Sequence, residues 1–125
     1  MKVDDLAGVQ EVCVASELSA ALMRRHGPSV NEFWLSHENK YPAMTIWVKD
    51  VVATLHYFPR EGHPGFRSLG DVAQAEQETV FCTESVWHTE SVSNKFVVPF
   101  VVAMAAALEF LLSKELPRSV NWMEL

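Results

Sequence analysis

Two runs of alternating apolar and polar residues, separated by two positions, constrain the fold of this chain more than any other feature. In the first run Met44, Ile46 and Val48 alternate with polar or aromatic neighbours, and a second alternating run covers residues 51–58. A period of two is typical of a strand with one buried face. The join at Lys49-Asp50 is too short for a crossover connection, so the two runs are predicted to form an antiparallel hairpin.

Further short strands are predicted on both sides of this hairpin. Apolar or alternating segments bounded by turn residues indicate strands at Val9–Val14, Glu32–Ser36, Thr79–Cys82, Ser85–His88 and around Val120 and Trp122. The segment Pro59–Asp71 is rich in Gly and Pro and is predicted to be a loop.

Two helices are predicted. Ser16 is the expected cap of the first, with Arg24 and Arg25 in its last turn and Gly27-Pro28 ending it. The second starts at Pro99, runs to about Lys114 and is apolar on two adjacent faces, so it is expected to be covered on most sides. These elements predict an α+β domain, an antiparallel sheet of about five to six strands with two packed helices.

Length and charge limit the classes of protein to consider. The 125 residues fit one domain, residues 1–125, and 49% hydrophobic residues argue against a disordered chain. The formal net charge is −6, which argues against direct nucleic-acid binding because phosphates attract a surplus of Lys and Arg.

The sequence favours a cytoplasmic location. The N-terminus lacks the apolar run of a signal peptide, and the two cysteines are too few for a disulfide scaffold. The most apolar stretch, residues 96–112, contains Pro99 and Glu109 and falls short of the ~20 apolar residues of a spanning helix. No contact with a membrane is expected.

Candidate catalytic chemistry is sparse. The five histidines lack zinc-ligand spacing, neither cysteine stands in a reactive context, and no glycine motif suits a phosphate. No catalytic residue, metal site or cofactor is therefore predicted. The alternative left open is a small hydrolase or metal-binding protein that uses His56, His63 and His88.

Acidic residues gather in one part of the chain. Between Arg67 and Lys95 there is no Lys or Arg, whereas five acids fall there. The plain interpretation is a solvated acidic edge. The functional interpretation is an anionic surface that binds a basic cleft, with Trp87 and His88 as anchors. Trp47 is a second candidate for an exposed aromatic anchor, unless a helix covers it.

The C-terminal residues carry a resemblance to a known family. A helix ending Ala107-Leu108-Glu109-Phe110-Leu111 and a final segment from Leu116-Pro117 to Trp122-Met123-Glu124-Leu125 resemble the family numbered first among the immunity proteins of bacterial polymorphic toxin systems. The strand Leu55–Phe58, the loop His63–Phe66 and Gly70 resemble that family's central strand and Gly-rich loop. The match extends over about residues 30–125.

The resemblance implies an inhibitor rather than an enzyme. Members of the family are encoded beside secreted toxins, frequently nucleic-acid cytosine deaminases, including those acting on double-stranded DNA. The implied partner is a cognate toxin domain, a zinc-dependent deaminase whose active site this protein would occlude. The predicted toxin contacts, chosen from charge and aromatic character, are Asp50, Glu61, Asp71, Glu76, Glu78, Glu84, Trp87, His88 and Glu90.

The free protein is expected to be a monomer. The remaining alternative is an adaptor module that forms a homodimer through the apolar face of its last helix, in which Phe96 and Phe100 are either core residues or dimer contacts.

Overall fold

The computed structural model describes residues 1–85 and 87–125. The N-terminal part contains β1 (Lys2–Asp5), β2 (Gly8–Glu11), α1 (Ala15–Leu22), β3 (Val30–Ser36), β4 (Ala43–Lys49) and β5 (Val52–Phe58). The C-terminal part contains β6 (Phe66–Leu69), η1 (Val72–Gln74), β7 (Glu78–Cys82), β8 (Thr89–Ser93), η2 (Asn94–Phe96), β9 (Val97–Pro99), α2 (Phe100–Ser113) and β10 (Asn121–Glu124).

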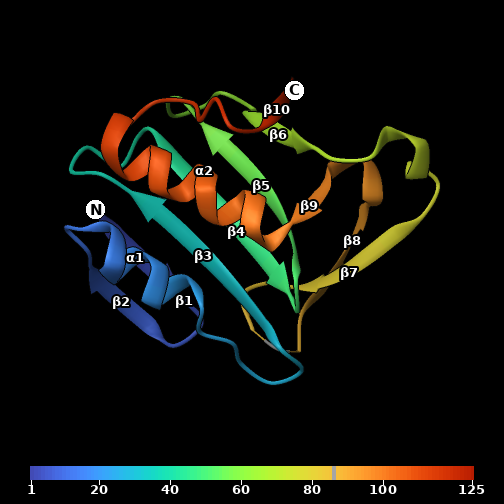
Figure 1. The fold of residues 1–125 in the computed structure, drawn as a ribbon, viewed down its shortest axis with the longest axis horizontal. Coiled ribbons are helices and arrows are strands. Elements are labelled where there is room, and N and C mark those ends of the chain that lie inside the picture. The colour runs from blue at the N-terminus through green and yellow to red at the C-terminus, as the bar shows by residue number, and fades with distance from the viewer. Residues whose placement is uncertain (86) are drawn as a thin grey trace.

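The described residues form one large antiparallel sheet and one small one, which confirms the predicted α+β class. The main sheet has the order β10-β6-β5-β4-β3-β1-β2, and β9 pairs with β5 as its eighth strand. Strands β7 and β8 form a separate two-stranded sheet (Figure 1). The main sheet is therefore larger than the predicted five to six strands.

The central hairpin lies where the alternation predicts it. Strands β4 and β5 pair in register from Ala43 opposite Phe58 to Lys49 opposite Val52. The connecting turn contains Asp50, whose φ is 50° and whose N–H donates to the Ser29 carbonyl at 2.8 Å. Aspartate tolerates this left-handed conformation better than most residues, so the Lys-Asp join is compatible with a tight turn.

The predicted N-terminal strand and the first helix both differ from the structure. The strand expected at Val9–Val14 is β2, which ends at Glu11 and pairs with β1, a strand the sequence did not predict. Helix α1 begins at Ala15 rather than after a Ser16 cap, because the Glu17 carboxylate accepts the N–H groups of Cys13 and Val14 at 2.9 and 3.3 Å. It ends at Leu22, so Arg24 and Arg25 follow the helix instead of lying in its last turn.

Two further segments differ from prediction. The last part of the predicted loop Pro59–Asp71 forms β6, which pairs with β5 on one side and β10 on the other. The partner strand of β7 is β8, which begins at Thr89, whereas the sequence placed a strand at Ser85–His88; residue 86 of that segment lies outside the described residues. Strands β3, β7 and β10 and helix α2 lie within two residues of their predicted positions.

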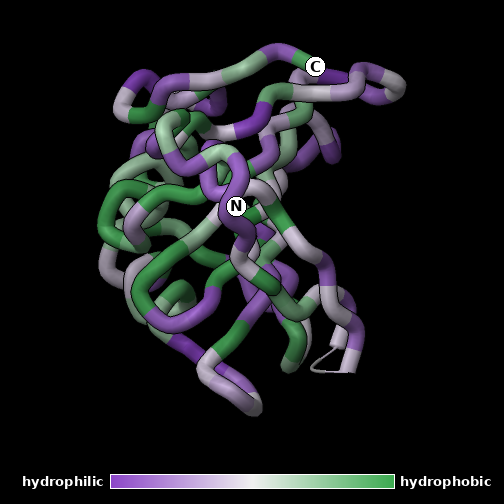
Figure 2. Tube along the Cα trace, turned by 90° about the vertical axis from the view of Figure 1, so that its right-hand side faces the viewer, coloured by the Kyte–Doolittle hydropathy of each residue, from purple (hydrophilic) through white to green (hydrophobic). Residues whose placement is uncertain are grey.

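The core lies between the main sheet and the two helices, which pack against the same face (Figure 1). Alternate residues of β3, β4 and β5, such as Phe33, Ile46 and Leu55, meet the apolar faces of the helices and are almost completely buried. Phe110 of α2 is fully buried and contacts the Tyr57 ring edge to face, with centroids 5.9 Å apart. In the side view, the most hydrophobic segments concentrate toward the helix side (Figure 2).

Within the described part of the chain, neither helix has the length and hydropathy needed to cross a bilayer.

Candidate functional site

The face of the main sheet opposite the helices, here called the open face, is only partly covered. Cross-strand pairing of Trp47 with Glu32 and with Thr54 places these three side chains on the open face. Strand β7 lies over this part of the sheet, and the ring of Phe81 packs against Trp47 with centroids 6.4 Å apart. Trp47 is thus a half-buried support for β7, neither an exposed anchor nor a residue under a helix.

Residues Asp71–Ser93, here called the acidic arm, follow β6 and comprise η1, β7, β8 and their connections. The arm carries five of the 16 acidic residues and no Lys or Arg, so it holds −5 of the formal net charge of −6. All residues from Asp71 to Glu78 are exposed. The charge cluster predicted from the sequence therefore falls on η1, β7, β8 and the segments beside them, at one side of the main sheet (Figure 1).

Seven of the nine predicted contacts lie on the acidic arm, and all seven are exposed. Trp87 is 91% exposed in the connection between β7 and β8, and Asp71 caps η1 by accepting the Ala73 N–H at 3.0 Å. The seven are Asp71, Glu76, Glu78, Glu84, Trp87, His88 and Glu90.

The fold brings Asp50 next to the arm. Asp50 and Glu78 line one open hollow of about 440 Å³ between the β4–β5 turn and β7. Its apolar lining includes the exposed Val51 and Val80, and an adjoining hollow contains Asp71. Lys49 also lines the hollow, so its lining carries two carboxylates and one ammonium group. The excess of carboxylates around apolar side chains suits a Lys or Arg of a partner, whose aliphatic stem packs on the apolar part while its charged head binds a carboxylate.

Glu61 does not join this group. It is exposed in the loop after β5, whereas Asp50 precedes β5, so seven residues of strand, roughly 20 Å, separate their backbones.

Glu90 lies on the arm's inner side opposite Phe81, where its charge acts on Arg67. Burial lowers the pKa of the Arg67 guanidinium, and the negative charge of Glu90 partly offsets that effect.

Backbone and side-chain hydrogen bonds hold the arm at both of its ends. At its base the Gly70 N–H donates to the Lys95 carbonyl at 2.6 Å, and the Ser93 hydroxyl donates to the Ala75 carbonyl at 2.6 Å. At its tip the Glu84 N–H donates to the Glu32 carboxylate of β3 at 3.3 Å. Burial raises the pKa of Glu32, and the hydrogen bonds from Glu84 and from the Trp47 side chain oppose that rise.

The alternative histidine site is not assembled. His56 donates from Nε2 to the Pro64 carbonyl at 2.8 Å, and burial lowers its pKa. His63 uses Nδ1 to accept the Gly65 N–H at 2.8 Å and directs Nε2 at Glu124, 3.3 Å away. His88 is exposed on the arm. Across residues 1–85 and 87–125, no three His, Cys, Asp or Glu side chains form a group that could hold a metal ion.

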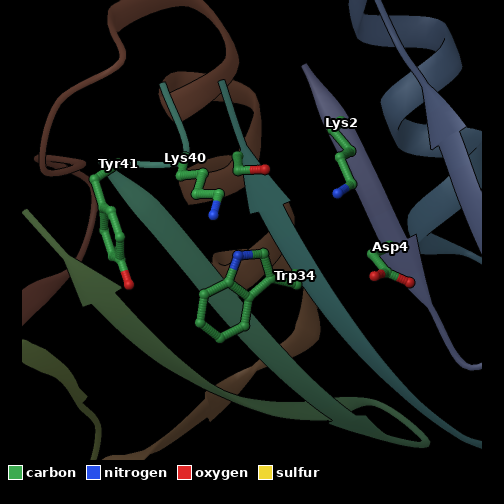
Figure 3. A pocket seen from close by; sticks show the side chains of 6 residues that line it. Lys2, Asp4, Trp34, Lys40 and Tyr41 are labelled. Atoms are coloured by element: carbon green, nitrogen blue, oxygen red, sulfur yellow. The ribbon is translucent and has the colours of Figure 1, made fainter. Parts of the chain in front are cut away.

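Sequence reasoning missed a second feature of the open face. Trp34 of β3, 40% exposed, stacks on Phe58 of β5 with centroids 5.7 Å apart. Lys2, Lys40 and Tyr41 surround the indole in a hollow of about 280 Å³ (Figure 3). The alternation in β3 indicates that Trp34 faces away from Phe33, but only the fold shows that the indole keeps an exposed part.

Two comparisons with known proteins relate the chain to immunity proteins. The chain is 28% identical over 126 residues to the double-stranded DNA deaminase immunity protein of Burkholderia cenocepacia (strain H111), and the alignment covers 100% of both chains. The model of the immunity protein Imm1 family matches residues 7–124. This match spans nearly the whole chain, from β2 to β10, and the chain therefore belongs to the Imm1 family of immunity proteins.

Proposed function

We propose that this protein binds a cognate toxin, a nucleic-acid cytosine deaminase, and neutralises it by placing the acidic arm over the entrance to the toxin's active site. The observation that carries the proposal is the concentration of −5 of the net −6 charge on one exposed element. Membership of an immunity-protein family and the name of the relative in Burkholderia cenocepacia support the class of partner.

The physical reason is electrostatic complementarity. A deaminase that acts on nucleic acid needs a positively charged path that leads the strand to its zinc-bound water. An acidic protein surface is attracted to the same path and competes with the phosphates for it. Opposite charges also steer the two proteins together, which raises the association rate at low salt.

The proposed contact surface consists of the arm and the adjoining hollow. Glu76, Glu78 and Asp71 provide charge, Asp50 extends the charged surface across the hollow, and Trp87 provides an exposed aromatic group of the kind that dominates binding energy at interfaces. Glu84 and His88 lie in the same β7–β8 connection as Trp87, whereas the charge of Glu90 acts on Arg67 and Glu61 lies at the other end of β5.

Occlusion requires no chemistry from the inhibitor itself. We therefore propose that residues 1–125 act as one non-catalytic domain without a cofactor, monomeric when free, in the cytoplasm where an incoming toxin would act. Neither direct binding of nucleic acid nor contact with a membrane is part of this proposal.

Co-purification with the toxin domain encoded beside this chain tests the proposal. A deamination assay on single- and double-stranded DNA then compares the toxin domain alone with the toxin domain plus equimolar immunity protein. We expect a stable complex and loss of deamination at a 1:1 ratio. A complex that keeps full activity would contradict occlusion, and the absence of a complex would contradict the choice of partner.

A further inference from the structure

The hollow around Trp34 is built on an aromatic stack that crosses the open face of the sheet. Trp34 of β3 and Phe58 of β5 meet diagonally over the intervening strand β4, where Thr45 pairs with Trp34 and the small, fully buried Ala43 pairs with Phe58. His56 also stacks on Phe58, with ring centroids 4.1 Å apart. The indole is therefore held in place before any partner arrives, which reduces the entropy that binding to it costs.

Two lysines give this hollow a charge opposite to that of the arm. The side chains of Lys2, from β1, and Lys40, from the β3–β4 loop, point toward the space beside the Trp34 ring (Figure 3). Neither lysine forms an ion pair with any residue that the structure describes. Asp4, which pairs with Trp34 across β1 and β3, also lines the hollow, so its lining carries two positive charges and one negative in a protein of net charge −6.

The hollow and the acidic arm lie on the same side of the sheet. Glu32 and Trp34 are two residues apart on β3 and share the open face, and the Glu84 N–H at the tip of the arm bonds Glu32. A partner bound to the arm therefore lies within reach of Trp34. A long anionic ligand such as DNA is disfavoured here, because the arm beside the hollow would repel its phosphates.

We propose that the hollow around Trp34 receives a short segment of the same toxin that carries an Asp or Glu next to an apolar side chain. The carboxylate binds between the ammonium groups of Lys2 and Lys40, and the apolar side chain packs on the exposed part of the indole. This inference rests on the proposed function. It adds a second contact, of opposite charge, which a basic nucleic-acid channel by itself would not provide.

Opposite charges at two neighbouring points also give selectivity. A basic surface alone is attracted to the arm, but only a toxin with an acidic segment at the right distance satisfies both contacts. A toxin with a basic segment there would place like charges against Lys2 and Lys40, which costs binding free energy.

The test measures binding of the neighbouring toxin domain to two variants of the hollow, W34A and the double reversal Lys2→Glu/Lys40→Glu. The matched control is Arg60→Glu/Lys114→Glu, which reverses two exposed cations outside the hollow and makes the same change in net charge. We expect Kd to rise at least about tenfold for each hollow variant and by less than about twofold for the control. Thermal unfolding of all variants checks that they fold.

A photo-crosslinking amino acid at position 34 identifies the occupant directly, with the same group at Leu112 of α2, 83% exposed, as a control on the helix side. We expect crosslinks from position 34, but not from position 112, to a toxin segment containing Asp or Glu. Crosslinks to a basic segment would overturn this inference. It would also be overturned if the hollow variants bind like the wild type while reversal of Glu76 and Glu78 weakens binding. Either result would leave the proposed function standing.

A wild-type protein that does not bind the toxin domain would overturn both. A DNA oligonucleotide provides the remaining comparison, since the inference expects no binding to it. Binding of the oligonucleotide that disappears in Lys2→Glu/Lys40→Glu would show that the hollow takes phosphate, and would overturn the peptide segment as its occupant.

Discussion

The helix-covered face of the main sheet and the acidic arm are held together by different interactions. On the covered face, side chains such as Phe33, Leu35 and Phe110 are fully buried against one another. On the arm, Phe81, Val92 and a few neighbours are buried, residues 71–78 are all exposed, and hydrogen bonds fix the base and the tip. Burial of apolar area therefore stabilises the first region far more than the second.

This difference separates stability from the proposed binding. Substitutions on the covered face are expected to unfold the protein, because they remove packing that surrounding atoms cannot replace. Exposed charges on the arm contribute little to folding, so they can change without loss of the fold. The two regions can thus be perturbed independently.

The largest expected loss of stability follows F110A in α2. Phe110 contacts the rings of Tyr57 and His37, with centroids 5.9 and 5.0 Å away, and its replacement leaves a cavity beneath the helix. We expect the free energy of unfolding to fall by about 4 kcal/mol, measured by urea denaturation. A loss below about 1 kcal/mol would show that the covered face is not the main source of stability.

Gly70→Ala perturbs the junction of the two regions. A Cβ at position 70 would overlap the Val97 carbonyl and crowd the Asn94 carbonyl, so the backbone would have to move. That movement would disturb the hydrogen bond from the Gly70 N–H to the Lys95 carbonyl. We expect a loss of about 3 kcal/mol. In the control Gly62→Ala, the new Cβ meets open space, and the only cost is the backbone strain of an alanine at φ +80°. We expect this variant to lose about 1 kcal/mol of unfolding free energy. Equal losses would contradict the steric argument.

F81A is expected to loosen the arm without opening the main sheet. Phe81 is fully buried against Trp47, which ties β7 to the open face. Local opening of a small element exposes its amides while the rest of the fold persists. We expect amide hydrogen exchange in β7 and β8 to accelerate at least about tenfold and that in β4 and β5 to change little. Equal acceleration in all four strands would show that the arm and the sheet unfold together.

A smaller effect, dependent on pH, is expected at the tip of the arm. Burial raises the pKa of Glu32 in the folded protein, so folding favours the protonated carboxyl group. Protonated Glu32 therefore adds to the free energy of unfolding at pH values below the ordinary glutamate pKa. This contribution is lost as the pH rises through the raised pKa of the folded state. Glu32→Gln keeps an oxygen to accept the Glu84 N–H and removes the charge. We expect it to be slightly more stable than the wild type at neutral pH, measured by thermal unfolding.

Glu109→Gln provides the control of opposite sign. The backbone N–H groups of Arg118 and Ser119 donate to the Glu109 carboxylate and lower its pKa. Glu109 therefore stabilises the fold at pH values above the ordinary glutamate pKa, and this stabilisation is lost as the pH falls through the lowered pKa of the folded state. At neutral pH we expect Glu109→Gln to be less stable than the wild type. The same sign for both variants would contradict the environment assigned to Glu32.

The sequence predicted the parts of the fold that local pattern determines. The β4–β5 hairpin and α2 have long, regular periodicities, and both were located within one or two residues. Strand β1 has only four residues, and β6 follows a loop of Gly and Pro, so each depends on pairing with distant strands. Such short pairings are tertiary effects that a local window does not contain.

The candidate site was predictable to a similar extent. The absence of cations between Arg67 and Lys95 is visible in the sequence and identified the arm. The approach of Asp50 to Glu78 and the separation of Glu61 depend on which end of β5 each residue adjoins. The exposure of Trp34 depends on how far β7 and β8 extend over the open face, which alternation alone does not determine.

The salt dependence of association with the toxin domain tests the central claim most directly. Glu76→Lys/Glu78→Lys reverses two exposed charges on the arm, and Glu38→Lys/Glu115→Lys makes the same change in net charge at exposed positions outside it. In stopped-flow measurements at low salt, we expect the arm variant to associate at least about tenfold more slowly than the control and with a weaker dependence on salt. Association rates and salt slopes that match between the two variants would contradict the role of the acidic arm.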